Sequence, residues 1–500
     1  MKRLAVLAAA LLGGLPSAGC GFGQSGIAPP VDRFFFPAGV AVDPGGDWLY
    51  VVNSNSDLRY NAGTVVAVDL RKAAEDRTAM AGAPRCPSSR FVPPDSSPPR
   101  FCCRDFIDDR VLACDERGYV ATASTVRIGS FGGTAVVQKL PGGGSPAARL
   151  FVAVRAEPSI TFIDADAAPG RVSLHCADPA AGGDSAAANP LCSDAWRIRS
   201  GPLQPDGQPL ALQEEPHFMV FDDALGVLYI GHLGGIERGL ALVRGVSVID
   251  VCAPRMRRPV LASVLADAVP RSGSLGVTAV VPSRPGDPAA AVFVTGEFTA
   301  NVGELVFRDP AQAGCDPARP PAGARDLSLV SGPQFTSSVY GTRGADLRGL
   351  VLAPDRPKAY VLHRQYANTS RAEFNPPSVV AVDRSLDPDG QPYNRPTGLV
   401  EVCTGPTELG WHDAGRGPRL FVTCFEGGQI YVVDPALMAV EAIIEVGAGP
   451  TALQFTAQDP TTAFVASFAS NGVLVIDLRP RSATEYRVVQ RIGFPRASGQ

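Results

Sequence analysis

The chain has 500 residues, 45% of them apolar, and a formal net charge of −4 at pH 7. A chain of this length can bury a large core, and length alone would suggest about three domains of roughly 100 to 200 residues. Lys and Arg are not gathered into a basic block, so the electrostatic footprint of a nucleic-acid-binding protein is missing. We therefore expect no nucleic-acid partner.

The chain begins with the pattern of an export signal. Lys2 and Arg3 precede an apolar run over residues 4–15, and small residues follow it. The run is too short to form a stable membrane span. Residues 1–19 are therefore predicted to be a signal peptide.

The small residues end in "SAGC" at residues 17–20, which resembles the lipobox of bacterial lipoproteins, whose cysteine is lipidated and becomes the mature N-terminus. Ser17 stands where a lipobox usually has Leu, so ordinary cleavage to a periplasmic or secreted protein is the alternative. We expect Cys20 to be lipidated, residues 20–30 to form a tether, and the membrane to be a partner through the lipid anchor. Because Gly21 rather than Asp follows the cysteine, the expected location is the outer membrane of a bacterial cell envelope.

Ten of the eleven cysteines follow Cys20, and an even number can pair completely in an oxidising compartment. None shows the Cys-x-x-Cys spacing of zinc ribbons, thioredoxin-like motifs or c-type haem sites. We therefore expect structural disulfides, no metal site and no cofactor. The ten are Cys86, Cys102, Cys103, Cys114, Cys176, Cys192, Cys252, Cys315, Cys403 and Cys424.

From residue 31 onward, one pattern of short strands recurs seven times. Each copy has an apolar strand, a strand with a leading aromatic residue, and a β-branched strand that ends in Asp. A fourth strand fits where room allows, so residues 31–497 are predicted to form an all-β, seven-bladed β-propeller with four-stranded antiparallel blades. An acid that recurs in every blade suits a turn better than catalysis. These acids are Asp69, Asp164, Asp250, Asp309, Asp383, Asp434 and Asp477.

The segment "LYVVN" followed by "VVAVD", together with "IEVGAGP" before an inner strand, resembles the YVTN family of seven-bladed propellers. The resemblance covers nearly everything after residue 36 and implies the fold, but its motifs are structural. Propellers of this kind include surface-layer and periplasmic binding proteins, and the related lactonase propellers include enzymes. The resemblance therefore leaves the functional class open.

Two long insertions follow the third strands of the first and second repeats, at about residues 71–118 and 165–213. They are expected on the face that we call the bottom, whereas the top holds the loops between second and third strands. Their composition lacks the apolar content to build a core, so disulfides are expected to order them.

The phase of the repeat predicts most of the disulfides, because equivalent positions in neighbouring strands or blades lie on the same face. The four cysteines of the first insertion are expected to form two bridges among themselves. Their connectivity stays open, but Cys102 and Cys103 are expected to pair with different cysteines. The predicted pairs are Cys403–Cys424, Cys252–Cys315 and Cys176–Cys192.

Candidate binding residues fall near the top of the propeller axis. In the inner strands, the position after the leading Pro is expected to ring the axis, and it holds His217 and Arg348 among otherwise small residues. His232 and His363 share a position after the second strand and could face the same cavity. Two histidines two blades apart make a poor metal site, so no metal is expected. The predicted ring is Ala38, Gly132, His217, Gly276, Arg348, Thr407 and Thr451.

The sequence holds no Gly-x-Ser-x-Gly elbow, no P-loop and no His-Glu-x-x-His, and no catalytic residue is predicted. The favoured function is a non-enzymatic binding or scaffolding lipoprotein whose partner is a protein, a glycan or a small anionic ligand. The alternative is a lactonase-like or other hydrolase whose top-face active site would use His217, Arg348, His232 and His363.

Overall fold

The computed structural model describes most of the chain beyond the N-terminal segment, and the predicted signal peptide and Cys20 lie outside the described residues. The described residues are 26–494 except 99, 143, 178–188, 234–235, 238–240, 243–244, 253–257, 267, 269–275, 285–291, 298, 317–324, 338, 340–344 and 366–375. Within them, no helix is long and apolar enough to cross a membrane.

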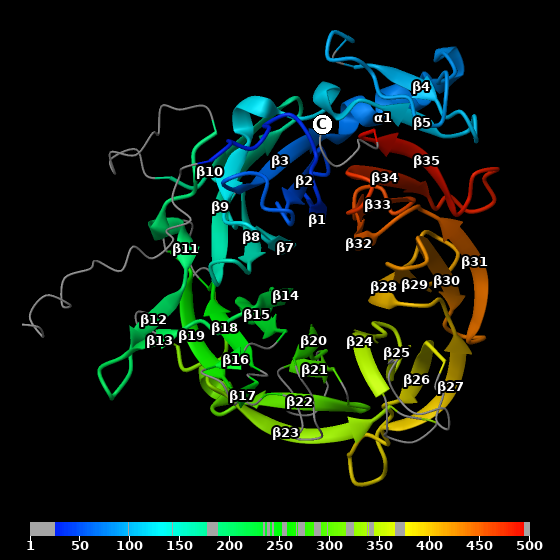
Figure 1. The fold of residues 1–500 in the computed structure, drawn as a ribbon. Coiled ribbons are helices and arrows are strands. Elements are labelled where there is room, and N and C mark those ends of the chain that lie inside the picture. The colour runs from blue at the N-terminus through cyan, green and yellow to red at the C-terminus, as the bar shows by residue number, and fades with distance from the viewer. Residues whose placement is uncertain are drawn as a thin grey trace, which may run out of the picture.

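The described strands form a ring of seven antiparallel blades around a central axis, as predicted (Figure 1). In each blade the inner strand comes first in the chain and the outer strand last. The first three blades are β1 (Pro37–Val42), β2 (Trp48–Asn53), β3 (Gly63–Asp69) and β6 (Val126–Ile128); β7 (Gly132–Lys139), β8 (Ala148–Val154), β9 (Ser159–Ala168) and β10 (Arg171–His175); and β14 (Pro216–Asp222), β15 (Val227–His232), β18 (Val246–Asp250) and β19 (Val260–Leu265).

The remaining four blades have the same strand order. They are β20 (Val277–Pro282), β21 (Val292–Gly296), β22 (Asn301–Phe307) and β23 (Leu329–Thr336); β24 (Ala345–Leu352), β25 (Lys358–Gln365), β26 (Ser378–Asp383) and β27 (Arg395–Glu401); β28 (Pro406–His412), β29 (Arg419–Cys424), β30 (Gln429–Asp434) and β31 (Ala439–Glu445); and β32 (Pro450–Phe455), β33 (Thr462–Ser467), β34 (Gly472–Asp477) and β35 (Arg487–Ile492).

The core lies between the blades. Every residue of β2, β8 and β15 is buried, because both faces of a second strand are covered by neighbouring blades. Apolar clusters join adjacent blades in turn, and one of them joins β2 and β3 to β33 and β34. The near-continuous apolar strands of the sequence are thus explained by burial on both faces.

The ring closes through side-chain packing and polar contacts between the first and last blades. The Phe36 N–H donates to Asn471 Oδ1 at 2.7 Å, and Thr451 Oγ1 donates to the Pro37 carbonyl at 3.2 Å. Residues 33–36 lie beside 491–494 without pairing as a strand, since β35 supplies the outer strand of the last blade.

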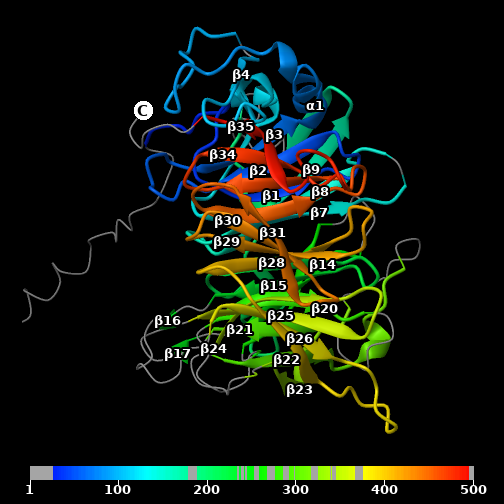
Figure 2. The ribbon, with the colours of Figure 1, turned by 90° about the vertical axis from the view of Figure 1, so that its right-hand side faces the viewer.

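The first insertion is a folded unit rather than a coreless loop, so that expectation was wrong. It starts with α1 (Leu70–Thr78) and includes β4 (Cys102–Arg104) and β5 (Leu112–Cys114). Strand β5 pairs in parallel with β35 and extends the last blade to six strands, and both views show this unit at the edge of the ring (Figures 1 and 2). Its few apolar residues form a small core because they pack with Phe494 of the C-terminal segment.

The second insertion begins later than predicted. Strand β9 runs on to Ala168 and folds back as β10, while β11 (Arg197–Ile198) pairs with the start of β9. Part of the predicted insertion is therefore the outer edge of the second blade. A hairpin of β12 (Ser200–Leu203) and β13 (Pro209–Ala211) follows and packs on β19.

Five disulfides link the ten described cysteines. They include the three pairs that the repeat phase predicts, and Cys102 and Cys103 have different partners. The bridges are Cys86–Cys103, Cys102–Cys114, Cys176–Cys192, Cys252–Cys315 and Cys403–Cys424.

The recurrent Asp ends the third strand in five blades, whereas Asp164 lies within β9 and Asp309 lies two residues beyond β22. In several blades this Asp has a turn role. Asp69 caps α1 by accepting from the N–H groups of Arg71 and Lys72, each at 3.1 Å. Asp434 accepts in the same way from the N–H groups of Ala436 and Leu437, at 2.8 and 3.0 Å. These short-range bonds explain why an acid recurs at this position.

Candidate functional site

Every inner strand carries a β-bulge near its top end. In six blades the pairing register shifts after Pro37, Pro216, Leu347 and their equivalents, so one extra residue stands between two paired ones. In the second blade two residues, Gly133 and Thr134, lie between the paired Gly132 and Ala135. Bulges re-aim side chains, and here they turn one position per blade toward the axis. The extra residues are Ala38, His217, Thr278, Arg348, Thr407 and Thr451.

Two members of the predicted ring are corrected by this register. The fourth blade places Thr278 at the bulge instead of Gly276, because its inner strand begins at Val277 without a leading Pro. In the second blade Gly132 is paired with Val154, and the shift follows it. The hydroxyl of Thr278 bonds to the Leu347 carbonyl, so this bulge also joins the fourth blade to the fifth.

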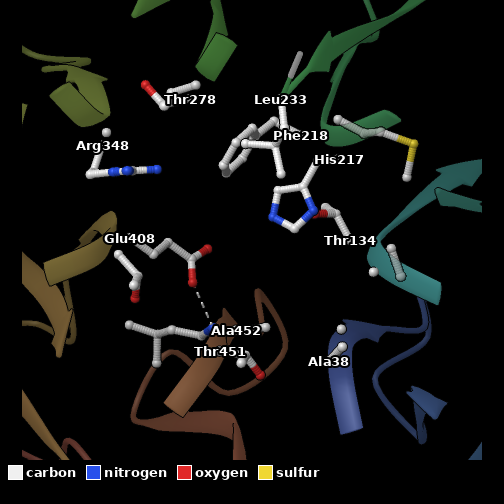
Figure 3. Close-up of a pocket in the computed structure, with 18 of the residues that line it drawn as sticks. Ala38, Thr134, His217, Phe218, Leu233, Thr278, Arg348, Glu408, Thr451 and Ala452 are labelled. Carbon is white, nitrogen blue, oxygen red and sulfur yellow. Dashed lines mark hydrogen bonds between the residues drawn. The ribbon is translucent and has the colours of Figure 1, made fainter. Parts of the chain in front are cut away.

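The bulges surround an axial cavity of about 670 Å³. Its wall combines inner-strand residues with top-face loops, and this volume is within the usual range for small-molecule sites. Figure 3 shows His217, Arg348 and Glu408, from three different blades, pointing toward the same space. The cavity is therefore the candidate ligand site.

His217 is a neutral group in this wall. Its ring meets Phe218 edge-on at 4.5 Å between centroids, and its Nδ1 is buried without a hydrogen-bond partner among the described residues. Burial, with Arg155 and Arg348 nearby, lowers its pKa from 6.5 to about 3. His217 therefore offers an uncharged imidazole at neutral pH.

Arg348 is held by two carboxylates. Its Nη2 lies 2.9 Å from Asp346 Oδ2 and 2.8 Å from Glu297 Oε1. Burial raises the pKa of Asp346 to about 6, although Arg348 acts in the opposite direction. The positive charge of Arg348 is thus compensated by two carboxylates within the wall.

Glu408 is the site residue that sequence reasoning missed. It follows the bulge of β28, and its Oε2 accepts from the Leu453 N–H of the next blade at 3.0 Å. Burial raises its pKa from 4.5 to about 7, against the lowering effect of that N–H. The signal in the sequence was a large acidic residue at a position where several other blades have a small one, namely Gly39, Gly349 and Ala452.

The Glu408 carboxyl predicts a pH-dependent stability. Between pH 4.5 and about 7 the folded protein binds a proton that the unfolded chain has lost, so its contribution to stability falls as the pH rises through this window. Glu408→Gln is therefore expected to raise the free energy of unfolding by on the order of 2 kcal/mol at about pH 8 and to change it little at about pH 4. Urea unfolding at both pH values measures this, and an equal difference at both would contradict the assignment.

His232 and His363 do not line the cavity. His232 is fully buried, with Nδ1 at 2.8 Å from the Glu214 carbonyl and Nε2 at 2.9 Å from Ser247 Oγ. His363 Nε2 lies 3.0 Å from Ser337 Oγ. Burial lowers the pKa of both to about 4. The structure thus brings His217 and Arg348 together at the cavity. His232 and His363 instead make hydrogen bonds within the protein.

The rim of the cavity carries two more arginines and several aromatic rings. Arg155 Nε lies 2.6 Å from Glu215 Oε2, and Arg364 Nη2 lies 2.9 Å from Glu426 Oε1. Among the rings, Phe425 and Phe468 have centroids 6.3 Å apart. In the described part of the chain, no group of three or more His, Cys, Asp or Glu could hold a metal ion.

Fold and site together define a seven-bladed β-propeller with an axial, top-opening cavity. No family model matches the chain, and no curated protein matches it. Similar solved structures include hydrazine synthase from Kuenenia stuttgartiensis, with 13% identity over 93% of this chain and 99% of that chain and a TM-score of 0.48. The periplasmic gluconolactonase PpgL from Pseudomonas aeruginosa is 16% identical over 83% of this chain and 86% of that chain, with a TM-score of 0.46. A putative 6-phosphogluconolactonase from Bacteroides uniformis is 11% identical over 83% of this chain and 87% of that chain, also with a TM-score of 0.46. Likenesses this distant carry over no activity and no site residue.

Proposed function

We propose that this protein is an exported, membrane-anchored β-propeller of the YVTN type that binds a small polar ligand in its axial cavity without chemical change. The observation that carries the proposal is the convergence of His217, Arg348 and Glu408 on one cavity. Three polar groups in a largely apolar wall are the arrangement by which small-molecule sites orient a ligand. The loop faces remain available to a protein or a glycan.

Export is supported by the five disulfides, because disulfides persist in oxidising compartments and are rare in the cytosol. The signal-like N-terminus and the lipobox-like "SAGC" support an anchor at Cys20. Lipidation with more than one chain gives stable anchoring. In this proposal the outer membrane holds the propeller on a short tether.

Cys20→Ser is expected to move the protein from the membrane fraction to the soluble periplasmic or secreted fraction, because the lipid chains would be lost. Folding should be unchanged, since the strands in the described part of the propeller run from residue 37 to residue 492. Fractionation followed by immunoblotting measures the distribution, with Ser17→Ala as the matched control. A Cys20→Ser protein that stays with the membrane would contradict the anchor.

Ala38→Phe is expected to abolish ligand binding, because Ala38 lines the cavity and a ring there would fill it. The readout is the thermal shift produced by a panel of small sugars, sugar acids and amines. Leu386→Phe is the control, because Leu386 is 53% exposed away from the cavity. If no compound shifts the wild-type protein, or if the Ala38→Phe protein responds equally, the cavity is not the binding site.

One observation favours hydrolysis as a second candidate. A carboxyl group with a pKa of about 7 is suited to act as a general base near neutral pH, and Glu408 is such a group. No hydrogen bond links Glu408 to His217 or Arg348 among the described residues, so the catalytic relay that hydrolysis needs is missing there. Lactone opening by the wild-type protein that is lost in Glu408→Gln would establish hydrolysis and overturn the binding role.

A further inference from the structure

We propose that the ligand of the axial cavity carries a protonated amine and that Glu408 is its counter-ion. This inference rests on the proposed binding role of the cavity and names the chemical class of the ligand. It is carried by the distribution of charge around the cavity and by the position of the Glu408 carboxylate within it.

The arginines of the cavity wall are already paired. Arg155 is held by Glu215 and Arg364 by Glu426 at the rim. Deeper in the wall, Arg348 contacts both Glu297 and Asp346. Each of these three arginines therefore meets at least one carboxylate, and none of them offers an uncompensated charge to an anionic ligand.

Glu408 is in the opposite situation. It lines the cavity and has no cationic partner among the described residues. Its Oε2 is taken by the Leu453 N–H, whereas its Oε1 has no hydrogen-bond partner among the described residues. Figure 3 shows the carboxyl group turned toward the open space and not into the protein. The free oxygen is thus available to a donor on a ligand.

A partly buried carboxylate without a counter-charge is costly, and this cost is what raises the pKa of Glu408. An ammonium group at Oε1 would remove the cost through a charge-assisted hydrogen bond, which is stronger than a neutral one. A neutral hydroxyl would supply a hydrogen bond but no compensating charge. A carboxylate on the ligand would add repulsion, so the site discriminates among these three classes.

The rest of the wall suits an ammonium ion. His217 is uncharged at neutral pH and keeps a buried Nδ1 without a partner among the described residues, so it adds no repulsion and can supply an acceptor. Phe218 lies beside it, and Phe425 and Phe468 line the mouth. Aromatic faces attract cations, most strongly where water is excluded.

Binding should release a proton near neutral pH. The cation prefers ionised Glu408, so affinity is expected to rise with pH up to the pKa of about 7 and then to level off. The other charged residues that line the cavity are Arg155, Arg348 and Arg364. Arg348 is paired with Glu297 and Asp346, Arg155 with Glu215 and Arg364 with Glu426. Asp346 has a pKa of about 6, so it also becomes negatively charged as the pH rises, while His217 stays neutral.

The test uses three probes of one shape: aminocyclohexanol, cyclohexanediol and hydroxycyclohexanecarboxylate, in the same ring geometry. At about pH 8, calorimetry or NMR titration of the full-length protein should show the amine binding about tenfold or more tightly than the diol, with the carboxylate weakest. The preference should shrink at about pH 5, and calorimetric heats in buffers of different ionisation enthalpy should reveal proton release near pH 7.

Glu408→Gln should remove the preference for the amine and leave the affinity for the diol within about twofold, which also shows that the variant is folded. Glu75→Gln is the matched control, because the Glu75 side chain is 60% exposed and remote from the cavity. Equal binding of amine and diol by the wild-type protein, or tightest binding of the carboxylate, overturns the amine proposal and leaves the binding role intact. If no probe binds at millimolar concentration the amine proposal also fails, and the binding role is then decided by the compound panel and Ala38→Phe.

Discussion

Replacing Cys252 and Cys315 together with Ala is expected to lower the free energy of unfolding by about 4 kcal/mol, since their bridge spans 63 residues of sequence and restricts the unfolded chain. The bridge ties the end of β18 to the segment after η5 (Pro310–Gln312), on the bottom of two adjacent blades. Urea unfolding followed by circular dichroism measures the change. A double variant within about 1 kcal/mol of the wild-type protein would contradict the chain-entropy account.

The matched control is the double replacement of Cys176 and Cys192, whose bridge spans 16 residues. The shorter loop predicts a smaller loss, of about 3 kcal/mol. Both proteins should keep the circular dichroism of an all-β fold before unfolding. A larger loss from the shorter bridge would show that local packing decides the stability, and not loop length.

The blades were predictable because their pattern is local. A short apolar strand bounded by turn residues can be recognised within a few residues, and a second strand such as β15 is apolar throughout because it is buried on both faces. The phase of the repeat then gave the face on which each cysteine lies. This is why Cys252 and Cys315 could be paired without knowledge of the tertiary structure.

The insertions were less predictable because their partners are distant in sequence. Strand β5 is only three residues long, and it pairs with β35 near the other end of the chain. Nothing in residues 112–114 identifies that partner. The two parts of the outer edge of the second blade, β10 and β11, are likewise separated by a long segment, so their common role depends on the fold.

The site was half predictable. His217 and Arg348 could be placed because each stands at an inner-strand position that the repeat makes recognisable. The bulge at this position turns their side chains toward the axis. The sequence marks Glu408 only as a large acid where several other blades have Gly or Ala, and its importance depends on burial and on what its oxygens contact. His232 was misleading for a related reason: its position was predicted, but its ring turns to Ser247 within its own blade and not to the axis.

Arg325→Met is expected to lower the free energy of unfolding by about 3 to 5 kcal/mol, because it leaves the buried carboxylate of Asp250 without its partner. The two side chains are 2% and 9% exposed, and Arg325 Nη2 lies 2.6 Å from Asp250 Oδ1. The same guanidinium donates to the carbonyls of Leu225, Ala313 and Gly226 at 2.7, 2.8 and 2.8 Å. It therefore joins the third and fourth blades at the point where the Cys252–Cys315 bridge also joins them.

Chemical denaturation measures the loss, and Arg356→Met is the matched control. Arg356 pairs with Asp355, but these side chains are 33% and 49% exposed, so removing the pair should cost less than about 1 kcal/mol. Adding Asp250→Asn to Arg325→Met should recover part of the loss, since the second change removes the unpaired charge. If Arg325→Met costs no more than Arg356→Met, the buried pair does not hold the two blades together, and the disulfide alone would account for the stability of this junction.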